Sequence, residues 1–223
     1  MDSLSLELIT KFFDMARNGD LEGLENIIEN EGNCITKKHM TEAFYKCCLH
    51  YKVMGQHENC LNLFIRKKAD IDAIHRESGL SPLMVCCQKG CSDLVQFLLN
   101  NGAYPNVSNR GDKKTALHWA IDTKYGENTN IVSMLIEHAR CNVNQTSSDG
   151  YTPLALAINR NQQKTIKLLL KADANYNQKH PNGTHLLEIF KKKNWMHLLD
   201  NMNSTNQEPI APLQQETPKA PNK

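Results

Sequence analysis

The sequence predicts an all-α fold, a solenoid of stacked helix-turn-helix units whose connecting loops are hairpin-like. The first observation is residues 79–106, where two short apolar segments, 82–88 and 92–100, are separated by a Lys-Gly pair. Ser81 suits the N-cap of the first helix and Pro82 suits its first position. Helices of about two turns cannot bury their apolar faces alone, so this unit needs copies of itself alongside.

Two copies of this unit follow in the chain, which is the second observation. Ser81 aligns with Thr115, 34 residues on, and with Thr152, a further 37 residues on. This spacing lies in the range of stacked helical repeats. The apolar pair of the second helix also recurs, as Leu98-Leu99, Leu135-Ile136 and Leu169-Leu170.

The three copies resemble the ankyrin repeat, whose pattern is Gly-x-Thr-Pro-Leu-His, a small-residue pair, Gly, then Val-x-x-Leu-Leu and Gly-Ala-x-x-Asn. The resemblance implies one repeat domain over residues 1–202, with degenerate first, second and last repeats. Residues 203–223 are rich in Pro, Gln, Asn and Thr and are predicted to be a disordered tail. The predicted repeats are 4–34, 36–74, 76–110, 112–146, 147–179 and 181–202.

The first two repeats depart most from the pattern. Residues 4–34 predict two helices joined at Asn18-Gly19-Asp20, with an apolar face on each. In residues 36–74, Thr41 is expected to start the first helix. About five additional residues near 51–55 predict a longer turn between its helices.

The fourth and sixth repeats each carry a local departure. Lys113 stands where Gly is usual, and residues 125–130 lengthen the turn between the helices of the fourth repeat. His118 occupies the family's His position, which implies a structural tie to the neighbouring repeat. The sixth repeat is short, and its apolar residues indicate a C-terminal cap.

The composition argues against a catalytic or metal centre. The eight cysteines include no Cys-x-x-Cys pair, and Cys47-Cys48 and Cys86-Cys87 fall on the small-residue positions of the repeat, which favours packing. No nucleotide-binding or nucleophile motif is present. We therefore expect no enzyme activity, no catalytic residue, no metal and no cofactor.

Charge and hydropathy set further expectations. No apolar run approaches the roughly 20 residues of a membrane span, and the first residues lack a signal-peptide pattern, so we expect a cytosolic or nuclear protein. Residues 1–33 carry eight acids and two bases, whereas 150–200 carry eight bases and three acids. The run Lys191-Lys192-Lys193 could contact an anion, but it is more simply a solvated helix face.

A stack of this kind binds proteins through its concave groove and loop tips, so we expect an adaptor or scaffold that is itself a monomer, with no specific nucleic-acid signal. The family's variable positions map onto thirteen residues. At the hairpin tips they are Glu77, Ser78, Leu80, Asp112, Lys114, Asp149 and Tyr151, and at the inner helix ends Gln88, Lys89, Asp122, Thr123, Asn159 and Arg160. Trp119 is equally consistent with the groove and with the core.

Three other roles remain open. The chain could resemble the NF-κB inhibitors, although the tail, with two acids and two lysines, lacks their acidic stretch. It could be a pathogen or viral ankyrin effector. It could also be a modification substrate: Asn106 and Asn177 each follow a Leu by eight residues, as asparaginyl hydroxylation requires in this family, and Thr217 precedes a Pro, as proline-directed phosphorylation requires.

Overall fold

The computed structural model describes residues 3–51 and 56–200. In those residues the regular structure is helical and includes no strand, with a single isolated β-bridge between Lys179 and His185. The predicted all-α class is confirmed. The helices are α1 (Ser3–Asn18), α2 (Leu21–Asn30), α3 (Lys37–His50), α4 (Gln56–Arg66), α5 (Pro82–Lys89), α6 (Ser92–Asn100), α7 (Ala116–Ile121), α8 (Thr129–Glu137), α9 (Pro153–Asn159), α10 (Gln163–Lys171), α11 (Leu186–Lys192) and α12 (His197–Asp200), with a 3₁₀ turn at Gly32–Cys34.

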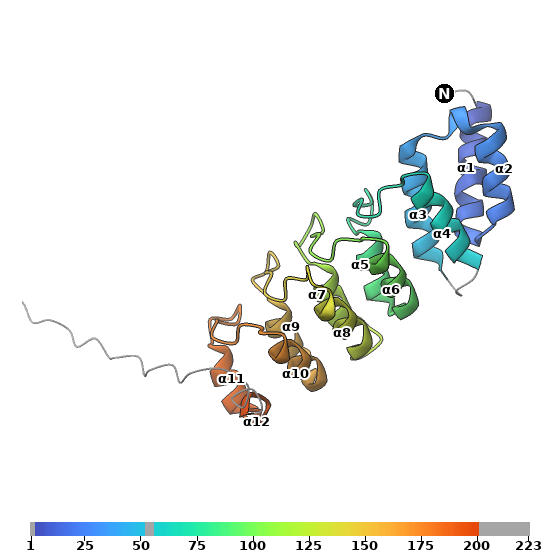
Figure 1. Cartoon of the computed structure of the whole chain (residues 1–223). Coiled ribbons are helices and arrows are strands. Elements are labelled where there is room, and N and C mark those ends of the chain that lie inside the picture. The colour runs from blue at the N-terminus through green and yellow to red at the C-terminus, as the bar shows by residue number, and fades with distance from the viewer. Residues whose placement is uncertain (1–2, 52–55, 201–223) are drawn as a thin grey trace, which may run out of the picture.

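The helices form pairs that stack in a row, and the loops between pairs project from one side of the row (Figure 1). The first helices of neighbouring pairs pack on one another in the order α3, α5, α7 and α9. The second helices do the same in the order α6, α8 and α10. We call the first set the inner helices, because the hairpin loops lead into them, and the second set the outer helices.

Capping residues explain where the inner helices begin. The Ser81 hydroxyl accepts a hydrogen bond from the Met84 amide at 3.3 Å, and Thr152 accepts one from Ala155 at 3.2 Å. Pro follows each of these caps at the first helical position, where a missing N–H costs nothing. Gly90 ends α5 in the left-handed conformation, with φ of 74°, which glycine adopts without strain.

One continuous apolar core runs through the stack from α1 to α12. Leu98, Leu135 and Leu169 are fully buried in it, at equivalent places in successive repeats. The short sixth repeat extends this core, and in it Phe190 and Trp195 pack edge to face, with ring centroids 6.4 Å apart. Buried residues of this repeat are Leu186, Phe190, Trp195, Leu198 and Leu199.

The predicted packing role of the cysteine pairs is confirmed. Cys47, Cys48, Cys86 and Cys87 are fully buried between helices, and no disulfide joins any of the eight cysteines, all of which lie in the described ranges. Burial raises the pKa of the Cys141 thiol to about 11 and that of Cys47 still further. Such thiols carry almost no thiolate at neutral pH and react slowly.

The degenerate second repeat differs from its prediction at the start of its first helix. Thr41 does not start its first helix: α3 begins at Lys37, because Thr36 caps it by accepting a bond from the His39 amide at 3.3 Å. Thr41 instead accepts a hydrogen bond from the Asp70 amide at 3.0 Å. The expected longer turn falls mostly on residues 52–55, which lie outside the described residues. The expected tail, residues 203–223, also lies outside them.

Candidate protein-binding site

The loops leading into the inner helices are hairpin-like, as predicted. In the first, the His75 amide donates to the Leu80 carbonyl at 3.0 Å, and the Gly79 amide donates to the His75 carbonyl at 2.9 Å. The same closure recurs further along the stack, where the Ser147 amide donates to the Tyr151 carbonyl at 2.9 Å. Each loop therefore presents a closed tip beside the start of an inner helix.

A ladder of short polar side chains holds the bases of these loops together. Asp72 accepts from the Tyr104 amide at 2.9 Å, Asn106 accepts from the Asn142 amide at 2.7 Å, and Asn144 accepts from the Asn175 amide at 2.8 Å. The Asn106 side-chain amide also donates to the Arg140 carbonyl. A hydroxylase would therefore have to withdraw Asn106 from two bonds, so its modification remains a prediction, as does that of Asn177. Thr217 lies outside the described residues.

His118 ties two repeats together, as the resemblance implied. Its Nδ1 lies 2.9 Å from the Thr115 hydroxyl and accepts from the Thr115 amide at 3.2 Å. Its Nε2 donates to the Tyr151 carbonyl in the next hairpin at 3.0 Å. The ring is completely buried. Burial lowers the pKa of His118 and the bond to Tyr151 opposes this, so the neutral ring with Nε2 protonated matches its partners.

An ion-pair network crosses the inner helices between the hairpin tips and the helix ends. Lys114 Nζ lies 3.1 Å from Asp112 Oδ2 and 3.0 Å from Asp122 Oδ2. Arg160, at the end of α9, donates to the other oxygen of Asp122. Burial lowers the pKa of Lys114, but hydrogen bonds to Asp122 and Asp112 outweigh it and raise the pKa overall. The network brings together four of the thirteen predicted residues and is electrically neutral.

A shallow pocket of about 280 Å³ opens beside this network. It is lined by Gln88, Lys89, Asp122, Lys124 and Tyr125. The first three were predicted from the sequence, and the last two were not. Lys124 and Tyr125 lie in the connection between α7 and α8, residues 122–128, which is longer than the two-residue connection between α5 and α6. The insertion seen in the sequence was the available signal.

Tyr125 and Arg160 are both exposed in this region and are therefore open to a partner. Tyr125 is 63% exposed, and the Arg160 side chain is 53% exposed. Tyrosine and arginine are the residue types enriched among interface hot spots. We define the inner face as the surface formed by Gln88, Lys89, Lys114, Trp119, Asp122, Thr123, Tyr125 and Arg160.

Several predicted contact residues have internal roles that limit what they can offer a partner. Leu80 was expected to reach a partner, but the structure places it in a small apolar cluster with Tyr45, Met84 and Val85, where it is 8% exposed. Thr123 donates to the Gln88 carbonyl at 3.1 Å, and Lys89 donates to the Leu49 carbonyl. These two bonds link the ends of successive inner helices.

The remaining predicted residues divide between open and half-buried positions. Glu77, Ser78, Asp149 and Asn159 are exposed. Tyr151 is half-buried, with its ring edge-on to His180 at 5.2 Å between centroids. Trp119 lies between its two expected roles: it packs partly buried against both apolar clusters, and Lys114 Nζ sits 5.1 Å from its ring centroid.

The described residues also show how this chain stands toward metal ions and membranes. Within residues 3–51 and 56–200, no three His, Cys, Asp or Glu side chains are grouped as they would be to hold a metal ion. None of the helices described is both long and apolar enough to cross a membrane.

Known proteins share this pattern of repeats. The family model described as ankyrin repeats in three copies matches residues 12–109 and again residues 105–180. An ankyrin repeat protein of Fowlpox virus (strain NVSL) is 36% identical over 129 residues, which cover 56% of this chain and 37% of the viral protein. Human transient receptor potential cation channel subfamily A member 1 is 29% identical over 159 residues, 70% of this chain and 13% of the channel.

A third relative is matched over most of its length. Protein phosphatase 1 regulatory subunit 27 from Homo sapiens is 30% identical over 117 residues, which are 52% of this chain and 71% of that protein. The chain thus spans only a small part of the channel and about a third of the viral protein. The family match over most of the described residues, together with the stacked helix pairs and hairpin loops, establishes that this chain belongs to the ankyrin repeat family.

Proposed function

We propose that this chain is an adaptor that binds a partner protein through its inner face and acts without a catalytic step. The observation that carries the proposal is the coincidence of the pocket beside Asp122 with two exposed hot-spot residue types, Tyr125 and Arg160. The Asp122 carboxylate is held by Lys114, so the neighbouring Arg160 is positioned before any partner arrives. Preorganised side chains lose less entropy on binding.

The arrangement also explains why binding residues can vary without loss of the fold. Tyr125 and Arg160 contribute little to the continuous core, whereas Leu98 belongs to it and the buried His118 ties two repeats together. Ankyrin repeats are typically protein-binding modules, which supports the proposed class of function. The human protein phosphatase 1 regulatory subunit 27 is named for a role of the same class.

The test compares two matched double variants of the full chain in capture from a cell lysate. Tyr125→Ala with Arg160→Ala alters the inner face. Tyr104→Ala with Arg140→Ala removes the same two residue types from another surface, where Arg140 lies over the Tyr104 ring at 5.6 Å and Tyr104 is 42% exposed. We expect at least one captured protein to fall about tenfold with the first variant, since losing hot spots costs at least 1–2 kcal/mol.

The same protein should be captured in unchanged amount by the Tyr104 and Arg140 variant. Both variants should unfold at the wild-type urea concentration, because all four side chains are substantially exposed. Equal capture by the wild type and both variants, or loss only with the Tyr104 and Arg140 variant, would place the binding surface elsewhere.

A further inference from the structure

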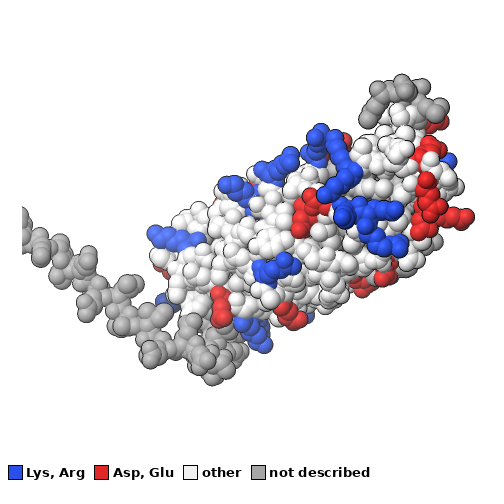
Figure 2. Space-filling view, turned by 45° about the horizontal axis from the view of Figure 1, so that its top comes forward, with Lys and Arg blue, Asp and Glu red and all other residues white. Residues whose placement is uncertain are grey.

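Basic side chains gather along the hairpin tips and at the start of α3. The tips are residues 75–79, 109–114, 147–150 and 179–183, and α3 starts after Thr36. These segments carry seven bases and three acids, a net charge of +4. On the face shown in Figure 2, basic side chains recur along one edge of the stack, whereas acidic side chains concentrate at its N-terminal end. We define the tip rim as the six exposed bases of these segments: Lys37, Lys38, Arg76, Arg110, Lys113 and Lys179.

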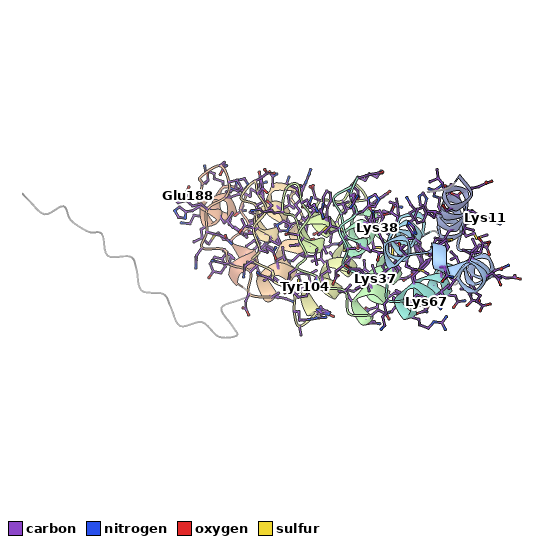
Figure 3. All side chains as sticks on the ribbon, turned by 90° about the horizontal axis from the view of Figure 1, so that it is seen from above. Lys11, Lys37, Lys38, Lys67, Tyr104 and Glu188 are labelled. Carbon is purple, nitrogen blue, oxygen red and sulfur yellow. The ribbon has the colours of Figure 1, made fainter. Side chains whose placement is uncertain are left out.

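The charge of the tip rim is not used inside the protein. Within the described ranges, none of the six side chains takes part in an ion pair, whereas the less exposed Lys114 makes two. Lys37 and Lys38 are consecutive residues of the first turn of α3 (both are labelled in Figure 3), where the helix dipole disfavours positive charge. Folding alone therefore gives no reason for this concentration of bases.

The backbone of Lys113 also indicates that folding alone gives no reason for a base at this position. Its φ is 55°, in the left-handed region that favours glycine. At the first tip, the equivalent position is held by Gly79. A lysine at such a position is strained. It retains an exposed positive charge in the second hairpin.

A second pocket lies at one end of the tip rim. It has a volume of about 260 Å³ and lies between α3 and the first hairpin, with Lys38 and Arg76 among its lining residues. Its apolar wall includes Tyr45, Ile74 and Pro82. The Tyr45 ring is stacked on His75, with centroids 4.2 Å apart, and the Tyr45 hydroxyl lies 2.6 Å from Ser78 Oγ. These two contacts join α3 to the first hairpin, and the pocket between them combines an apolar wall with two bases.

Glu42, the acidic residue that lines this pocket, is already paired within the protein. Glu42 Oε1 lies 3.0 Å from Lys46 Nζ and 3.2 Å from His75 Nε2. Lys38 and Arg76 thus face solvent without an internal counter-charge and dominate the pocket's field.

We propose that the tip rim binds an acidic, extended segment of a partner protein, with one apolar side chain of that segment in the pocket beside Tyr45. This inference rests on the proposed function and names the chemistry of the partner. Glu77 and Asp149 interrupt the rim, which suits a peptide with spaced charges better than a continuous phosphate backbone. Among the described residues, the exposed large apolar side chains are Leu6, Tyr104 and Tyr125, none of them on the tips, so the rim has no stacking platform for bases and no apolar anchor for a bilayer.

The test measures fluorescence anisotropy of a labelled synthetic peptide of about 20 residues, with alternating acidic and small residues and one leucine, at about 50 mM salt to limit screening. The rim variant carries Lys38→Glu, Arg76→Glu, Arg110→Glu and Lys113→Glu. The control variant makes the same charge change at four exposed lysines of α10 and α11, namely Lys164, Lys167, Lys171 and Lys192. We expect the rim variant to weaken binding at least tenfold and the control variant to weaken it less than threefold.

A single substitution separates binding from stability. Lys113→Gly removes one charge and relieves the left-handed strain, so affinity for the peptide should fall about two- to threefold while the urea midpoint stays the same or rises. A loss of affinity accompanied by a lower midpoint would contradict the assignment of Lys113.

Three results would overturn the proposal. The first is that the rim variant and the control variant weaken peptide binding equally. The second is that a peptide with Gln and Asn in place of the acids binds as tightly as the acidic peptide. The third is that an oligothymidine of equal length, or phosphatidylserine vesicles, bind more tightly than the acidic peptide. Capture from a cell lysate distinguishes failure of this proposal from failure of the proposed function. If Tyr125→Ala with Arg160→Ala abolishes capture while the rim variant retains it, the acidic-segment proposal fails and the proposed function stands.

Discussion

Replacing His118 with alanine should lower the free energy of unfolding by about 2–4 kcal/mol. The ring is buried and joins Thr115 to the Tyr151 carbonyl of the next hairpin. Alanine would leave buried polar groups on both repeats without partners and would open a cavity. Because neighbouring repeats stabilise one another, the loss falls on the interface between the fourth and fifth repeats. Urea unfolding followed by far-UV circular dichroism measures it.

His185→Ala is the matched control for this substitution. His185 is exposed and precedes α11 without a side-chain capping bond, so its loss should change the free energy of unfolding by no more than about 0.5 kcal/mol. Equal effects of the two substitutions would mean that the His118 bonds do not hold the repeats together.

The His118 substitution has a second expected signature in acid. Burial lowers the pKa of His118 in the folded chain, with the Tyr151 bond opposing it, so the unfolded chain takes up this proton first, near pH 6.5. The part of the folding stability that is linked to His118 is therefore fully present above about pH 6.5. It falls as the pH drops from there toward the pKa of His118 in the folded chain. His118→Asn should lose this part of the dependence, and identical pH slopes in the wild type and the variant would contradict it.

Leu98→Ala should be more damaging still, at about 3–5 kcal/mol. Leu98 is fully buried in α6, which packs against both α5 and α8. A cavity there weakens contacts within the third repeat and between the third and fourth repeats. This loss is a large part of the stability of an ordinary domain. Chemical unfolding of the full chain should show a lower midpoint.

Leu6→Ala provides the comparison, because Leu6 is 60% exposed on α1. It removes the same atoms from water-exposed surface, so the expected change is within about 0.5 kcal/mol. A loss below about 1 kcal/mol for Leu98→Ala would show that the third repeat does not pack as described.

The helical stack could be predicted from the sequence because the residues that start each helix and form its buried side lie close together in the chain. Ser81 and Pro82 start α5, and the spacing of Leu94, Val95, Leu98 and Leu99 defines the buried side of α6. The start of α3 was misplaced because Thr36 and Thr41 are both acceptable caps in sequence. Only the bond from the His39 amide distinguishes them.

The candidate site was less accessible to sequence reasoning because it depends on contacts between repeats. Leu80 was expected at the surface, yet the first hairpin folds it onto Tyr45 of the preceding repeat. Tyr125 gave no family signal, because it lies in an insertion whose position relative to Asp122 and Lys89 appears only once α5 and α7 are packed. The tip rim likewise combines residues from separate loops.

Hydrogen exchange of the full chain, with and without a captured partner, tests the central claim most directly. Binding through the inner face should slow exchange in the ends of α5, α7 and α9 and in residues 122–128, while α6, α8 and α10 change little. Slower exchange confined to the outer helices α6, α8 and α10 would contradict the assignment of the inner face as the partner-binding surface.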